Sequence, residues 1–323
     1  MNTQTLTQDH LRSRPRQGRR LRVRLRSLGP LALLALVAGL CVQAYRLCLV
    51  EQLQAHWQNY RTGDTAPGRN VWLPGYRVTI DAKPIAPELR NLSGITYDHD
   101  HDRLLAITNR PMELLVMNKE GDLEARYPLV GFEDTEGLTY LGGNRVAIAD
   151  EDQQRLDVIT LPPREQPILA SSAQSLTLAL GLTHNNKGFE GVTYDARNDR
   201  LFAIKERDPQ QLYSVSGMLR SIQGPLNLTV TDLTTWVERG RYARDLSDGY
   251  YDPRTGHLLL LSDQSMNITE LDDQGRFVSI RSLRAALGGL QQDAPQAEGL
   301  TMDNDGNLYV VSEPNLFYQF QKR

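Results

Sequence analysis

A short motif recurs five times along this chain. In each copy, a small polar or acidic residue precedes a glycine, which leads into an apolar run and then a turn rich in Asp, Asn and Gly. The motif glycines lie 43 to 58 residues apart, at Gly94, Gly137, Gly191, Gly249 and Gly299. Repeats of this length built from short strands are typical of β-propellers. The sequence therefore predicts an all-β propeller, in which equivalent positions of every blade gather around one axis.

The repeats predict four-stranded blades. A second apolar run follows each turn, as at 103–109 and 145–151, and is typical of a strand buried on both faces. The fifth repeat ends after a third strand at 316–321, so we expect residues 76–81 to supply its fourth. Such a strand would close the ring and remove its open edges. Five blades are preferred, because a sixth would require a copy that has lost its motif.

The N-terminus has the pattern of a membrane anchor. Residues 28–45 are 18 residues without charge, close to the length that a membrane-spanning helix needs. Eight arginines between Arg12 and Arg26 precede them and should stay in the cytoplasm. A cleaved signal peptide is the alternative, although its apolar core is usually shorter. The predicted domains are a basic cytoplasmic tail (1–27), a transmembrane signal anchor (28–50), a juxtamembrane helix and linker (51–71) and a propeller outside the membrane (72–323).

Charge and cysteine content narrow the class of protein. The net charge is −3, and residues 1–64 carry +7, so the remainder carries −10. An acidic folded domain is not expected to bind nucleic acid, which requires a basic folded surface. The two cysteines, Cys41 and Cys48, both lie in the apolar N-terminal segment. The propeller must therefore be stabilised by its own core, without disulfides.

Two sets of polar residues are predicted to meet on one face of the propeller. In an antiparallel pair, the start of one strand lies beside the end of the next. The starts of the first strands and the ends of the second strands therefore share a face, which we call the acidic mouth. The first set is Ser93, Glu136, Glu190, Asp248 and Glu298, and the second is Asn109, Glu151, Glu206, Asp263 and Glu313.

In such a ring, the electrostatic repulsion between the carboxylates must be offset by other groups. Two carboxylates about 6 Å apart repel by roughly 3 kcal/mol at an effective dielectric near 20. A bound cation, a basic ligand or raised pKa values would relieve this. Oxygen ligands without Cys or clustered His favour Ca²⁺. The predicted metal ligands are Glu136, Glu190, Asp248 and Glu298, and the alternative internal counter-charges are Arg110, Lys205 and Arg207. A purely structural reading also stands, in which the acids are exposed loop residues and the glycines let the inner strands crowd the axis.

The motifs resemble those of a known family. Leu92-Ser-Gly-Ile-Thr-Tyr-Asp, Asp134-Thr-Glu-Gly-Leu-Thr-Tyr and Val146-Ala-Ile-Ala-Asp-Glu resemble the SdiA-regulated (YjiK-like) membrane-anchored propellers over roughly residues 72–323. The resemblance implies an inner-membrane protein with a periplasmic propeller, and it implies no activity. The Glu-Gly-Leu element is also similar to that of phytase-like and esterase-like propellers, in which axial acids hold calcium.

Two functions remain open at the acidic mouth. The preferred interpretation is a module that binds an envelope protein or small-molecule ligand, with Ca²⁺ at the mouth. The alternative is a calcium-dependent hydrolase of phytase-like, esterase-like or lactonase-like type, in which the ion would polarise the substrate. His184, in the loop before Glu190, is the one weak candidate for a catalytic base.

Overall fold

The chain forms two compact units, residues 1–45 and 46–323, which are described separately. The computed structural model describes residues 28–46, 49–178, 188–239 and 242–322. In the first unit, helix α1 (Leu28–Arg46) exposes most of its leucines, and Leu34 is 68% exposed. Across the described ranges, no helix combines the length and apolarity that crossing a membrane demands. The predicted transmembrane anchor is thus not shown.

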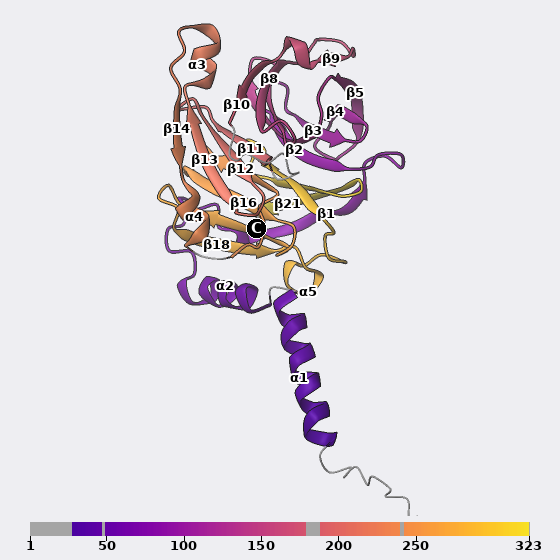
Figure 1. Ribbon diagram of the computed structural model, residues 1–323, viewed down its shortest axis with the longest axis vertical. Coiled ribbons are helices and arrows are strands. Elements are labelled where there is room, and N and C mark those ends of the chain that lie inside the picture. Colours follow the sequence, from indigo (N-terminus) through magenta and orange to yellow (C-terminus); the bar gives the residue numbers. More distant parts are fainter. Residues whose placement is uncertain (1–27, 47–48, 179–187, 240–241, 323) are drawn as a thin grey trace, which may run out of the picture. The chain divides into compact units, whose positions relative to one another are not determined.

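The second unit contains five antiparallel blades, as the five motifs predict (Figure 1). Blade 1 is β2 (Leu92–Asp98), β3 (Arg103–Asn109), β4 (Met112–Met117) and β5 (Leu123–Val130), extended by the short parallel β9 (Ile168–Leu169). Blade 2 is β6 (Thr135–Gly142), β7 (Arg145–Asp150), β8 (Arg155–Thr160) and β10 (Gln174–Thr177). Blade 3 is β11 (Phe189–Asp195), β12 (Arg200–Lys205), β13 (Gln211–Ser216) and β14 (Thr229–Asp232). Blade 4 is β15 (Asp248–Asp252), β16 (His257–Ser262), β17 (Asn267–Leu271) and β18 (Phe277–Ser282). Blade 5 is β19 (Ala297–Met302), β20 (Leu308–Ser312), β21 (Leu316–Lys322) and β1 (Tyr76–Pro84).

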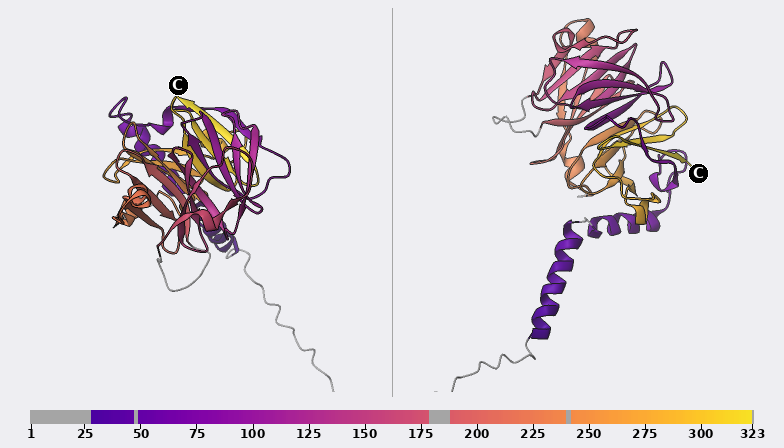
Figure 2. Two further views of the ribbon diagram at one scale, coloured as in Figure 1. Left: turned by 90° about the horizontal axis from the view of Figure 1, so that it is seen from above. Right: turned by 90° about the vertical axis from the view of Figure 1, so that its right-hand side faces the viewer.

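The N-terminal strand closes the ring as predicted. β1 pairs antiparallel with β21, from Tyr76 opposite Lys322 to Pro84 opposite Leu316. Both views of Figure 2 show the yellow C-terminal strands beside the purple strands from the start of the propeller. Since the last blade combines both ends of the domain, it leaves no unpaired edge at the junction.

The motif glycines allow neighbouring blades to touch at the backbone. A Cβ on Gly137 would lie 2.4 Å from the carbonyl oxygen of Glu190, and one on Gly191 would lie 2.7 Å from the Cα of Asp248. A Cβ on Gly299 would lie 2.7 Å from the nitrogen of Ile95, which joins blade 5 to blade 1. The glycines thus recur because inner strands pack closer than any side chain permits.

Short helices connect or cover the blades. They are α2 (Leu49–Thr62), η2 (Leu73–Gly75), η3 (Ala170–Ser172), α3 (Met218–Gln223), α4 (Thr234–Glu238) and α5 (Ala285–Gly288). Of these, the sequence predicted the helix within residues 51–71, where α2 lies. It missed α3 and α4, which are too short for a helical period to be visible.

Helix α2 and the following segment pack onto blade 4. The side-chain amide of Asn59 donates to the carbonyl of Ile280 at 2.8 Å and accepts from its N–H at 3.2 Å. The buried carboxylate of Glu270 accepts hydrogen bonds from the backbone N–H groups of Val71 and Trp72 at 2.8 and 3.0 Å. The segment predicted as a linker is therefore attached to the propeller through buried polar contacts.

Candidate functional site

A β-bulge presents the first set of mouth residues in four of the five blades. In blades 1, 2, 3 and 5 the strand register shifts at the residue before the motif glycine. A bulged residue has no partner in the ladder, and its side chain is redirected from the regular alternation. The bulged residues are Ser93, Glu136, Glu190 and Glu298.

Blade 4 lacks this bulge. Asp248 lies opposite Leu261 in a regular ladder, and its side chain is 1% exposed. Its Oδ2 accepts a hydrogen bond from the backbone N–H of Leu300 at 2.8 Å. Burial raises the pKa of Asp248 well above its ordinary value, and no other carboxylate contributes to that shift. Asp248 therefore supports the contact with blade 5 and is not brought together with the glutamates.

Among the described residues, the tightest group of acids belongs to blade 2 and lies beside Asn109 of blade 1. Asp134, Glu136 and Glu151 each offer a carboxylate oxygen, and these oxygens lie within 4.8 Å of one another. The amide of Asn109 donates to Asp134 at 3.1 Å and to Glu136 at 2.6 Å. Glu151 accepts from the backbone N–H of Gly188 at 3.0 Å. We call Asp134, Glu136, Glu151 and Asn109 the blade-2 cluster.

The pKa values show that these carboxyl groups interact. Burial raises the pKa of Glu136 to about 8, and the charge of Asp134 adds to the shift. Burial, with Asp134 again, raises the pKa of Glu151 to about 7. The pKa of Asp134 is also raised by burial, and the charge of Asp152 adds to the shift. Burial therefore favours the protonated form of all three carboxyl groups.

The remaining mouth acids interact with one another across blades. Burial raises the pKa of Glu190 well above its ordinary value, followed by repulsion from Glu151, Glu136, Glu206 and Glu298. Burial and then repulsion from Asp263, Glu136, Glu313 and Asp245 do the same for Glu298. Burial, with Asp245 next, raises the pKa of Asp263 to about 6. Burial also raises the pKa of Glu206 and of Glu313. The mouth thus contains carboxyl groups from blades 2 to 5 that repel one another.

Basic residues neutralise only part of this charge. Arg207 forms an ion pair with Glu206, with 2.8 Å between Nε and Oε2. Lys205 donates to the carbonyl oxygens of Arg207 and Pro209. Arg110 lowers the pKa of Asp134 through its charge. Arg207 and Arg110 therefore act on mouth carboxyl groups, Arg207 by direct contact.

Sequence reasoning overlooked two mouth acids. Asp134 precedes Glu136 by two residues, and this Asp-x-Glu spacing could have revealed it. Asp245 is 1% exposed and accepts from the backbone N–H of Gln264 at 3.1 Å. Its charge raises the pKa of Asp263. His184 lies outside the described residues.

Two cavities lie elsewhere, beside α2 and the segment after it. One of about 430 Å³ is lined by α2, β1, β18 and α5, and one of about 680 Å³ by α2, residues 65–70 and the outer part of blade 4. Neither is lined by a carboxylate of the mouth. The acidic chemistry and these cavities are thus separate features.

Three solved structures show a distant likeness to this chain. A luciferin-regenerating enzyme is 11% identical, with 76% of this chain and 95% of that chain covered and a TM-score of 0.47. A streptogramin B lyase is 9% identical, with 80% and 100% covered and a TM-score of 0.45. A chain of a nidogen/laminin complex is 10% identical, with 73% and 84% covered and a TM-score of 0.42. At such identities and scores, the chemistry of these proteins carries nothing over to the present mouth.

The sequence itself matches a family model. The model for the SdiA-regulated family aligns with residues 68–321, which span all five blades and the closing strand. The earlier resemblance to this family is thereby confirmed. This chain belongs to the SdiA-regulated family.

Proposed function

We propose that the propeller is a cation-dependent binding module, with Ca²⁺ held at the acidic mouth by the blade-2 cluster. The observation that carries this proposal is the close approach of three carboxylate oxygens, within 4.8 Å of one another, on Asp134, Glu136 and Glu151. Burial raises the pKa values of all three, and the charge of Asp134 adds to the shifts of Glu136 and Glu151, so a cation bound among them would relieve an unfavourable arrangement.

The ligand chemistry favours a hard cation. The three carboxylates offer only oxygen, and Ca²⁺ accepts six to eight oxygen ligands in flexible geometry. The side-chain oxygen of Asn109 is buried without a hydrogen-bond partner among the described residues, while its nitrogen serves two carboxylates. A cation bound by those carboxylates would let Asn109 turn this oxygen toward the ion. Glu190, whose pKa is raised by burial and then by the charges of Glu151 and Glu136, is proposed as a further ligand.

The ion would give the mouth its binding function. A Ca²⁺ ion cancels part of the carboxylate repulsion and leaves coordination positions that an anionic or carbonyl group can fill. The proposed ligand is thus an envelope protein or small molecule that contacts the ion from outside. The other mouth acids repel anionic groups that do not contact the ion.

Titration of metal-free full-length protein tests the proposal. We expect heat release and a raised Tm with Ca²⁺, and loss of both in Glu151→Gln, because the site loses a charged ligand. Glu124→Gln is the matched control, since Glu124 is an exposed strand residue outside the mouth. Absence of heat and of any Tm change in the unaltered protein at millimolar Ca²⁺ would refute the site.

An activity panel separates the two functional alternatives. Phosphomonoesters, lactones and aryl esters would be assayed with and without Ca²⁺. Turnover that requires Ca²⁺ and disappears in Glu190→Gln would replace the binding module with the hydrolase. Absence of turnover with every substrate of the panel, together with Ca²⁺ binding, supports the binding module.

We also propose that the propeller faces the periplasm from the cell membrane, with the arginine-rich N-terminus in the cytoplasm. Support comes from the eight arginines before an uncharged segment and from the exposed leucines of α1. A C-terminal alkaline phosphatase fusion should be active, because that reporter requires export. An inactive phosphatase fusion beside a fluorescent cytoplasmic reporter fusion would contradict this orientation.

A further inference from the structure

Helix α2 carries an apolar face that nothing in the propeller covers. Val50, Leu53, Trp57 and Tyr60 are 55%, 62%, 60% and 82% exposed. Their spacing of three, four and three residues places them on one side of the helix. The rings of Trp57 and Tyr60 stack with centroids 6.0 Å apart. The four side chains, here called the outer face of α2, form a continuous apolar strip.

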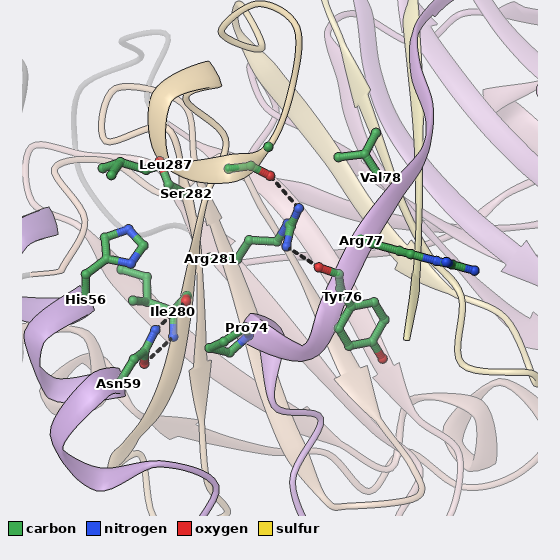
Figure 3. A pocket seen from close by; sticks show the side chains of 12 residues that line it. His56, Asn59, Pro74, Tyr76, Arg77, Val78, Ile280, Arg281, Ser282 and Leu287 are labelled. Carbon is green, nitrogen blue, oxygen red and sulfur yellow. Dashed lines mark hydrogen bonds between the residues drawn. The ribbon is translucent and has the colours of Figure 1, made fainter. Parts of the chain in front are cut away.

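The opposite side of α2 is polar and buried, the reverse of an ordinary surface helix. Gln52, Ala55 and Asn59 are 1%, 0% and 8% exposed. Gln52 donates to the carbonyl of Ser265, and Asn59 makes two hydrogen bonds with the backbone of Ile280, drawn in Figure 3. These directional bonds fix the rotation of the helix. The apolar strip therefore cannot turn inward without breaking buried hydrogen bonds.

We propose that the outer face of α2 binds the interfacial region of a lipid bilayer, so that blade 4 rests against the membrane. Trp and Tyr prefer this region, where their apolar rings and polar groups are both satisfied. Arg61 lies in the last turn of the helix and complements anionic headgroups. The uncharged segment of α1 ends at Tyr45, four residues before α2 begins at Leu49, so the two apolar stretches are close in sequence.

A second copy of the chain is the rival occupant. The spacing of the outer face also suits a two-helix seam. Such a seam is typically sustained over three or more heptads, whereas α2 has 14 residues. The cavity that α2 lines with Leu287 of α5 lies beside the inner-face residue Asn59 and not along the apolar strip (Figure 3). An apolar strip on a single short helix that ends in Trp and Tyr fits the interfacial region of a bilayer better than it fits a long helical seam.

Fluorescence quenching by lipid tests the proposal on the full-length protein. The protein would be reconstituted into vesicles of phosphatidylethanolamine and phosphatidylglycerol, with or without brominated acyl chains. We expect brominated lipid to quench part of the tryptophan emission. That quenched part should disappear in Trp57→Phe and persist in Trp236→Phe, because Trp236 packs in the propeller against Gly275. Unchanged Tm in both variants verifies that each is folded.

Two results would overturn the inference. Protein that fails to float with the vesicles, or that floats with the same quenching in Trp57→Phe as in the unaltered chain, excludes contact between Trp57 and lipid. Efficient crosslinking of Leu53→Cys between two copies in vesicles, without quenching, assigns the face to a dimer. None of these readouts involves Ca²⁺, so they are independent of the mouth.

Discussion

Replacing Glu136 with glutamine should stabilise the cation-free protein, and only at high pH. The pKa of Glu136 is raised from 4.5 to about 8 by burial, with Asp134 adding to the shift. The folded protein therefore retains a proton that the unfolded chain loses above pH 4.5. Below pH 4.5, Glu136 is protonated in both the folded and the unfolded state, and its burial does not lower the free energy of unfolding. As the pH rises from 4.5 toward 8, the free energy of unfolding falls, because only the folded state keeps the proton.

The size of the effect follows from that interval. Each pH unit between the two pKa values costs about 1.4 kcal/mol, so the whole interval amounts to at most about 5 kcal/mol. Asp134 and Glu151 interact electrostatically with Glu136, so removing one ionisable member of the cluster relieves only part of this cost. We expect Glu136→Gln to raise the free energy of unfolding by about 2 kcal/mol at pH 8 and by little at pH 4.5. Glutamine can still accept the hydrogen bond from Asn109.

Denaturant unfolding of the full chain in detergent with a chelator, at both pH values, measures the difference. Glu124→Gln again serves as the control, with no change expected at either pH. Saturating Ca²⁺ should reverse the order, because a ligand present at 100 times its Kd stabilises the unaltered protein by about 2.7 kcal/mol. An equal gain at both pH values, or none at pH 8, would refute the electrostatic reasoning.

Three further substitutions test separate features of the fold. Gly137→Ala should destabilise the propeller by about 1–3 kcal/mol, because the added methyl group would lie 2.4 Å from the carbonyl oxygen of Glu190; thermal unfolding measures the loss, and an unchanged Tm would contradict it. Glu270→Ala should lower the free energy of unfolding by about 3 kcal/mol or more, since it leaves several buried donors without an acceptor. Residues 49–75 should then become more sensitive to protease. Unchanged protease resistance would argue against a role of Glu270 in docking this segment. Asp248→Asn should leave the Ca²⁺ affinity measured by calorimetry unchanged, because Asp248 lies apart from the glutamates. A tenfold weaker affinity would show that Asp248 is a ligand of the ion.

The repeat by itself determined most of the fold. Five glycines at similar spacing gave the number of blades, the strands around them and the incomplete fifth blade that β1 completes. This information is local, because strand periodicity, turn residues and glycine can each be read from a few neighbouring positions. The sequence also indicated which residues begin and end the inner strands, and thus the face on which the acids lie.

Only the tertiary structure decided how those acids are used. The motif of Asp248 reads like that of Glu190, yet one has a regular register and the other a bulge, a choice that depends on the packing of neighbouring blades. Asp134 lies beside Glu136 in the sequence, but only the folded blade brings Glu151 to the same place. The polar inner face of α2 hydrogen-bonds to blade 4, which is more than 200 residues away in sequence. Register, burial and docking depend on contacts between distant segments, and a repeat pattern carries no information about them.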